Sequence, residues 1–146
     1  MNCIILAAGY ATRLYPLTKE FPKPLLPVAG VTILDRLVKK ALAVPEVRSI
    51  IVVSNDRFYS HFHQWRSETA EASRITLVND GSVSNEERVG ALRDLQLGVE
   101  VSEDAEPTIV LAGDNLFDFD LRAFAAFFAE RGADCITTHR LTERER

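Results

Sequence analysis

The chain has 146 residues, of which 47% are hydrophobic and 26% are charged. These proportions are typical of one soluble globular domain with a packed core, and they exclude a disordered chain. The net charge of −4 argues against general nucleic-acid binding. The charge is uneven, because residues 1–40 carry six basic and two acidic side chains, a net +4, so the remainder carries −8. A cationic start on an acidic chain suits a small anionic ligand bound at one place.

The apolar run at residues 3–8 is too short to span a membrane, and it lacks the basic leader of a signal peptide. We therefore expect no targeting segment, a cytoplasmic location and no membrane partner. Cys3 and Cys135 both fall inside predicted strands, and neither has a second cysteine at metal-ligand spacing. Both are expected to be buried, reduced, structural thiols.

Five short apolar runs predict β-strands. They cover residues 2–7, 49–54, 75–78, 108–112 and 134–138. The second run reads Ser-Ile-Ile-Val-Val-Ser, a continuous apolar stretch of the kind that is buried on both faces of a sheet. The fourth run, at 108–112, is predicted to be buried as well.

The segments between these runs have apolar residues at helical spacing and are predicted to be helices. Thr32 can cap a first helix, and a second carries Phe58, Phe62 and Trp65 at helical spacing. A fourth helix is predicted over 121–131, from a cap at Asp120 to a stop at Gly132. The third helix is predicted over 86–99, and its inward-facing residues are predicted to be Val89, Leu92, Leu95 and Val99.

This alternation predicts an α/β fold for residues 1–146 as one domain: a three-layer α/β/α, Rossmann-like arrangement with a mostly parallel sheet and right-handed crossovers. Ligands of such sheets bind outside the carboxyl ends of the strands. Three segments with chemistry-bearing residues follow predicted strands in this chain, namely 6–27, 79–85 and 113–115. We expect them to meet at one edge of the sheet.

The first of these segments suits a phosphorylated ligand. It opens with Leu6, Ala7, Ala8 and Gly9, whose small side chains let backbone N–H groups approach an anion closely, and Gly9 can adopt a positive φ at little cost. A strand followed by a tight turn also occurs in many α/β proteins without any ligand. The loop alone therefore does not decide between these interpretations.

Two cations follow on the same segment. Arg13 offers a planar fork that can grip phosphate oxygens through two hydrogen bonds, whereas Lys23 is a point charge suited to one developing negative charge. Pro22 and Pro24 flank Lys23, which predicts a stiff segment with Lys23 in extended backbone. The alternative is that both cations are simply solvated.

Asp114 is the candidate metal ligand. It follows a buried strand and Gly113, so the strand would deliver its carboxylate rigidly to the ligand edge, where a hard oxygen could hold Mg²⁺ against phosphate oxygens. The alternative interpretation is an aspartate that belongs to a turn or caps a helix.

Three separated motifs sharpen the prediction. Leu-Ala-Ala-Gly, Thr-Arg-Leu and Pro-Lys-Pro-Leu-Leu-Pro-Val, at these offsets, resemble the sugar-phosphate nucleotidyltransferase family, in particular its glucose-1-phosphate thymidylyltransferase and uridylyltransferase members. The resemblance implies an enzyme that joins a nucleoside triphosphate to a phosphorylated sugar or alcohol, with Mg²⁺ on Asp114. It covers the first, nucleotide-binding half of the family's domain. The family commonly has a second glycine where this chain has Ala11, so a positive φ there would strain the alanine.

By the same resemblance, residues 79–92 occupy the place where the family recognises the nucleobase. Asn79 and Asn85 are candidates because an amide presents a donor and an acceptor to a base edge, and Gly90 would let the base lie close to the backbone. Each of these residues could equally belong to a turn or a helix cap.

The resulting hypothesis is that loop N–H groups from Ala7 to Thr12, with Arg13, hold the β- and γ-phosphates while Lys23 stabilises charge at the α-phosphate. The favoured reaction is thymidylyl or uridylyl transfer to glucose 1-phosphate, and the alternative is cytidylyl transfer to phosphocholine or another alcohol phosphate. A nucleotide-binding module without turnover is a third possibility if the chain ends at Arg146. A sheet edge at 134–138 could drive self-association into a homo-oligomer.

Overall fold

The computed structural model describes residues 1–102 and 106–138. Its centre is a four-stranded sheet in the order β5-β4-β1-β6, and every neighbouring pair of strands is parallel. The strands are β1 (Asn2–Leu6), β4 (Ser49–Ser54), β5 (Ile75–Asn79) and β6 (Thr108–Ala112). Because all four run the same way, their carboxyl ends lie at one edge, as the sequence predicts.

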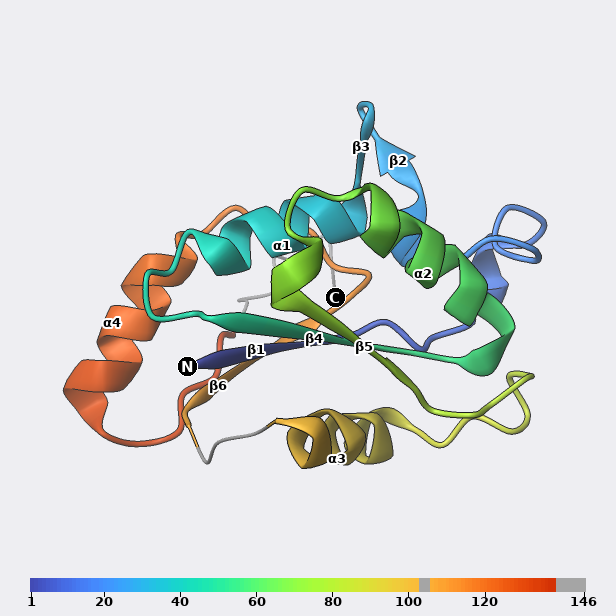
Figure 1. Ribbon diagram of the computed structural model, residues 1–146. Helices are drawn as coiled ribbons and strands as arrows, with labels where there is room; N and C mark the ends of the chain where they lie inside the picture. Colours follow the sequence, from blue (N-terminus) through green and yellow to red (C-terminus); the bar gives the residue numbers. More distant parts are fainter. Residues whose placement is uncertain (103–105, 139–146) are drawn as a thin grey trace, which may run out of the picture.

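Helices cover both faces of this sheet (Figure 1). On one face lie α1 (Ile33–Leu42), α2 (Tyr59–Glu68) and α4 (Leu121–Arg131), and on the other lies α3 (Ala91–Val101). The predicted three-layer α/β/α architecture is confirmed. In the described part of the chain, no helix is long and apolar enough to cross a lipid bilayer.

The core is divided by the sheet into two layers. Successive strand residues point to opposite faces, so Cys3 and Ile5 pack in the large cluster under α1, α2 and α4, whereas Ile4 packs on the α3 side. All three are fully buried. The prediction of a buried Cys3 thiol is confirmed, and burial raises its pKa to about 12.

Helix ends follow the local sequence signals. The Thr32 hydroxyl accepts a hydrogen bond from the Asp35 N–H at 2.9 Å and starts α1, and the Asp120 carboxylate accepts one from the Arg122 N–H at 2.9 Å and starts α4. Gly132, at a φ of 61°, ends α4. These predicted boundaries are confirmed.

The third helix differs from the prediction. It begins at Ala91 and not at residue 86, because Gly90 has a φ of 90° and interrupts the helical backbone. Its buried positions are Asp94 and Gly98, whereas Leu92 is 85% exposed. Gly98 lies against Ile4, so closely that a Cβ would stand 2.9 Å from its Cγ2. Of the predicted inward residues, Leu95 alone packs against the core; Val89, Leu92 and Val99 are exposed.

The structure differs from the prediction at residues 134–138 and in the burial of β6. Residues 134–138 are not a strand; they have no regular structure, Ile136 is 84% exposed, and Cys135 is only half-buried. Two apolar side chains among five residues are too few to hold this segment in a sheet. β6 is buried on one face only, because α3 leaves Val110 uncovered.

A small hairpin that the sequence did not predict stands before α1. It pairs β2 (Pro27–Val28) with β3 (Val31–Thr32), and its turn residues Ala29 and Gly30 both have positive φ, 50° and 78°. Positive φ at both central residues is typical of tight two-residue hairpin turns.

Candidate functional site

The loop after β1 is held to the body of the protein by its carbonyl groups. The buried Asn55 side chain donates to the Ala8 carbonyl at 2.9 Å, and the Thr18 hydroxyl donates to the Ala11 carbonyl at 2.8 Å. Within the described part of the chain, the N–H groups of Gly9 and Ala11 make no hydrogen bond to another residue. The loop can therefore present N–H donors to an anion without first breaking internal bonds.

The left-handed residue of this loop is Ala11 and not Gly9. Ala11 has φ 47° and ψ 42°, whereas Gly9 has no positive φ. Gly9 therefore does not use the positive φ that its lack of a side chain allows, and the strain expected for a positive φ at Ala11 is present. Left-handed backbone costs an alanine roughly 1–2 kcal/mol because its Cβ crowds the following carbonyl.

Replacing Ala11 with glycine should stabilise the protein. Glycine adopts positive φ freely but is more flexible when unfolded, so we expect the free energy of unfolding to rise by a net of about 0.5–1 kcal/mol. Urea denaturation measures this change. Ala43→Gly is the matched control, because Ala43 has right-handed helical backbone and glycine there should lower stability by about 0.5–1 kcal/mol. A loss of stability in Ala11→Gly would contradict the strain at this position.

Lys23 and Asp114 form an ion pair between the first loop and the end of β6. The Lys23 Nζ donates to the Asp114 Oδ2 at 3.0 Å, and the carboxylate is half exposed. Lys23 begins a 3₁₀ turn, Lys23–Leu25, and the extended backbone is at Pro22. The prediction of extended backbone at Lys23 is therefore wrong, although Pro22 and Pro24 are both buried and hold the turn in place.

Gly113 brings the end of β6 against the loop. Its N–H donates to the Leu6 carbonyl at 2.8 Å, and a Cβ on Gly113 would stand 2.7 Å from that same oxygen. Such a distance is shorter than any ordinary carbon–oxygen contact. A residue with a side chain at this position would push Asp114 away from the loop.

We therefore expect Gly113→Ala to be destabilising. The clash is with backbone atoms that have no room to move, so a loss of about 1–3 kcal/mol in the free energy of unfolding is expected. Gly9→Ala is the matched control, since a Cβ on Gly9 meets nothing within 4 Å, and it should change stability by less than about 0.5 kcal/mol. Thermal and urea denaturation both measure the difference. Equal stability of the two variants would contradict the close approach at Gly113.

These elements surround a cavity of about 300 Å³ at the carboxyl edge of the sheet. The first loop, the Lys23 turn, the start of α3 and the end of β6 all contribute to its wall. The predicted site residues that line it are Leu6, Ala7, Ala8, Gly9, Lys23, Gly90 and Asp114. The structure thus brings residues from four separate segments of the sequence to one place.

Four predicted residues lie outside this wall. Thr12 and Arg13 are exposed on the 3₁₀ turn that follows Ala11. The Asn79 amide donates to Asp56, 23 residues earlier, and accepts from the Gly81 N–H in a local turn, and the Asn85 carbonyl oxygen accepts from the Arg88 side chain at 2.9 Å. Both asparagine side chains therefore have partners within the protein.

Part of the cavity wall is acidic, and the sequence pattern did not predict it. Asp80 and Asp94 both line the cavity. The Ser82 N–H and hydroxyl bond to Asp80 Oδ1 at 2.7 and 2.8 Å, and the Ser82 hydroxyl also contacts the Tyr10 hydroxyl at 3.1 Å. Burial, together with the neighbouring Asp80, raises the pKa of Asp94 to about 6. The signal that could have found Asp94 is its position one helical turn after Gly90.

The residues present fit a magnesium ion that is shared with a phosphate. Among the described residues, no group of three or more His, Cys, Asp or Glu side chains could enclose a metal ion. Mg²⁺ keeps several waters and is commonly bound by one or two carboxylates plus substrate phosphates. The half-exposed Asp114 carboxylate, beside a loop with free N–H groups, meets that requirement.

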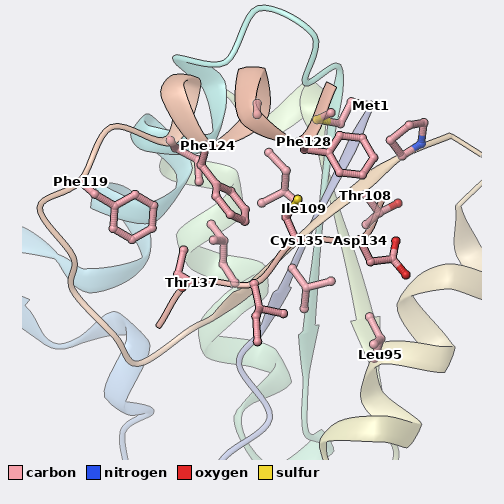
Figure 2. Close-up of a pocket in the computed structure, with 16 residues that line it drawn as sticks. Met1, Leu95, Thr108, Ile109, Phe119, Phe124, Phe128, Asp134, Cys135 and Thr137 are labelled. Atoms are coloured by element: carbon pink, nitrogen blue, oxygen red, sulfur yellow. The ribbon is translucent and has the colours of Figure 1, made fainter. Parts of the chain in front are cut away.

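A second cavity, of about 590 Å³, lies beside β6 and α4 (Figure 2). Phe119, Phe124 and Phe128 line it from one side and Ile109 from the sheet, and the segment that holds Cys135 passes across it. Its wall is mainly apolar, and Asp134 is the one charged side chain among the described residues that line it. We assign it no chemistry.

The fold and the first cavity define the class: a parallel α/β domain with a cavity at the carboxyl edge of its sheet, bordered by the loop after β1. The model of the nucleotidyl transferase family matches residues 2–146. The chain belongs to this family.

Named relatives agree with this assignment. The chain is 41% identical over 63 residues to the bifunctional protein GlmU of Methanococcus aeolicus, which is 42% of this chain and 15% of that protein. It is 29% identical over 135 residues to mannose-1-phosphate guanyltransferase beta-B of Xenopus laevis, which is 92% of this chain and 36% of that protein.

A solved structure shares the fold. The crystal structure of a protein assigned as a glucose-1-phosphate thymidylyltransferase from Bacillus anthracis, in complex with sucrose, superposes with a TM-score of 0.76 and 25% identity, over 89% of this chain and 50% of that one. This chain therefore spans half or less of the length of these relatives.

Proposed function

We propose that this domain carries the nucleotide site of an enzyme that joins a nucleoside triphosphate to a sugar 1-phosphate and releases pyrophosphate. The observation that carries the proposal is the cavity in which the open loop after β1 meets the Lys23–Asp114 pair. One anion-binding loop, one cation and one carboxylate at a single place are the groups that nucleotidyl transfer requires.

The reaction needs no general base. A phosphate monoester is already anionic near neutral pH, so an oxygen of the sugar phosphate attacks the α-phosphorus directly. The bond from the α-phosphorus to the oxygen that bridges to the β-phosphate breaks, and pyrophosphate leaves with that oxygen. The protein's contribution is to position the two phosphates and to stabilise the charge that develops between them.

The roles divide among the loop and the two cations. The N–H groups of Gly9 and Ala11 hold the β- and γ-phosphates, whereas the Ala7 N–H is excluded because it donates to the Val53 carbonyl at 2.8 Å. Arg13, which is exposed beside the loop, reaches the outer phosphate oxygens. Lys23 stabilises the charge at the α-phosphate. Asp114 would hold Mg²⁺, which when bound neutralises phosphate charge and orients the phosphate oxygens.

A pyrophosphate-release assay tests the reaction. Each of the common nucleoside triphosphates is combined with glucose 1-phosphate, mannose 1-phosphate, N-acetylglucosamine 1-phosphate and phosphocholine, with and without Mg²⁺. Pyrophosphate that depends on both a triphosphate and a sugar 1-phosphate supports the proposal. Release that requires phosphocholine would favour the alternative, an alcohol-phosphate cytidylyltransferase.

A module that binds nucleotide without turnover is the second candidate. It is favoured by the length of the chain, which spans 36% of the Xenopus laevis relative. Calorimetry separates the two, because triphosphate binding without pyrophosphate release from any acceptor supports the module and contradicts turnover by this chain.

A further inference from the structure

Asn55 is a buried asparagine that joins the end of β4 to the loop after β1. It is fully buried, and it does not line the first cavity. Its Oδ1 accepts from the Phe58 N–H at 2.9 Å, and its Nδ2 donates to the Ala8 carbonyl at 2.9 Å. The amide therefore has one stable orientation, because a flipped amide would direct its NH₂ group at an N–H and its oxygen at a carbonyl.

This contact determines how one peptide group of the loop is oriented. The peptide between Ala8 and Gly9 is trans, so its carbonyl and its N–H point in opposite directions. Because Asn55 holds the Ala8 carbonyl on the buried side, the Gly9 N–H is directed to the other side. Gly9 is exposed and lines the cavity, and its N–H makes no hydrogen bond to another residue in the described ranges.

The segment that holds the loop is itself fixed in the protein. The Asn55 side chain caps a short 3₁₀ turn that ends at Phe58. The Phe58 ring is buried and packs against the ring of Tyr10, the residue after Gly9, with 6.0 Å between the ring centroids. This turn therefore contacts the loop on both sides of Gly9. A donor that is oriented before its ligand arrives loses little conformational freedom on binding.

We propose that Asn55 is a positioning residue for the phosphate site. It fixes the peptide after Ala8 so that the Gly9 N–H is directed at the pyrophosphate part of a bound triphosphate, and it touches no substrate atom itself. The inference rests on the proposed function in that the cavity binds the phosphates of a nucleotide. It gives the segment after β4, which lines no part of the cavity, a role in that binding.

Pyrophosphate, the product of the proposed reaction, is the probe for this role because it carries neither base nor sugar. Its binding is measured by calorimetry in the presence of Mg²⁺. Asn55→Ser keeps an oxygen that can cap the turn, but a serine side chain has no amide donor and is too short to reach the Ala8 carbonyl. We expect the affinity for pyrophosphate to fall about 10-fold, because the peptide must then be ordered on binding.

Asn2→Ser is the matched control. Asn2 is also a buried asparagine with both ends of its amide bonded, since it donates to the Ser102 hydroxyl at 2.6 Å and accepts from the Ser49 hydroxyl at 2.7 Å. It lies at the opposite end of β1 from the loop. The control should lose stability in urea denaturation but keep its affinity for pyrophosphate. An equal loss of affinity in both variants would assign the effect to general destabilisation and overturn the proposal.

Nuclear magnetic resonance of the unmodified protein provides a test that does not depend on how Asn55→Ser folds. Labelling with ¹⁵N-glycine restricts the amide signals to the chain's seven glycines, and Gly9→Ala identifies the Gly9 signal by its loss. A hydrogen bond to an anion moves an amide proton downfield. Pyrophosphate should therefore shift the Gly9 proton further downfield than that of Gly132, which ends α4, and the Gly9 shift should be smaller in Asn55→Ser.

The outcomes separate the role of Asn55 from the reaction. Equal pyrophosphate affinity in Asn55→Ser and the unmodified protein, or binding that leaves the Gly9 amide proton unmoved, overturns the proposal even if the enzyme turns over. A Gly9 shift together with weaker binding in Asn55→Ser supports the proposal even where no acceptor yields pyrophosphate, and that absence contradicts the reaction alone. Failure of the unmodified protein to bind pyrophosphate contradicts both.

Discussion

Lys23→Ala is expected to lower kcat by about 10²- to 10³-fold, the loss typical of removing one group that stabilises transition-state charge. The KM for the triphosphate should change by less than about 5-fold, because the N–H groups of the loop and the Mg²⁺ that Asp114 would hold still bind the outer phosphates. The Lys23 ammonium is 3.0 Å from Asp114 in the free protein, at the place where the charge of the transferring phosphate would develop. Steady-state kinetics of pyrophosphate release measure both parameters.

Two controls separate charge stabilisation from other effects of this substitution. Lys19→Ala removes the same charge from an exposed position on the same segment that does not line the cavity, and it should leave kcat unchanged. Lys23→Arg keeps the positive charge but places it on a planar guanidinium, and it should have a higher kcat than Lys23→Ala. If Lys23→Ala loses affinity and turnover equally, Lys23 serves in binding and not in the chemical step.

The elements that follow from local chemistry could be predicted from the sequence. β4 lies over Ser49–Ser54, where the apolar run places it, and Thr32 and Asp120 cap the helices that follow them. A helix cap bonds to a residue two or three positions away, so the sequence alone is enough to predict it. The convergence of Lys23 and Asp114 was also predictable, because each follows a strand of a parallel sheet.

The features that depend on contacts between distant segments could not be predicted. The inward face of α3 is set by Gly98, which lies against Ile4 on β1, and by Asp94, which faces the cavity. Apolar residues in that segment predict an inward face of Val89, Leu92, Leu95 and Val99, but the fold leaves all of these except Leu95 exposed. The acidic wall was missed for the same reason, since Asp80 and Asp94 meet only when β5 and α3 are placed side by side.

The failure at residues 134–138 has a different cause. A strand is stabilised by hydrogen bonds to a neighbouring strand and by a buried face, and neither is encoded within five residues. In the described part of the chain this segment passes beside the apolar cavity at α4 without entering a sheet. A short run with only two apolar residues, Cys135 and Ile136, is therefore a weak predictor of a strand where the neighbouring strand is unknown.

Asp114→Asn is expected to lower the rate at saturating Mg²⁺ by about 10²- to 10³-fold and to raise the Mg²⁺ concentration needed for half-maximal rate, because a neutral amide is a weaker ligand for a hard cation than a carboxylate. Stability should fall by less than about 1 kcal/mol, since the ion pair with Lys23 is solvent-exposed. Asp118→Asn is the matched control, an exposed aspartate four residues later that does not line the cavity. Magnesium titrations of pyrophosphate release compare the three proteins. An unchanged magnesium response in Asp114→Asn would show that the ion is held elsewhere, and the assignment of Asp114 would then fail.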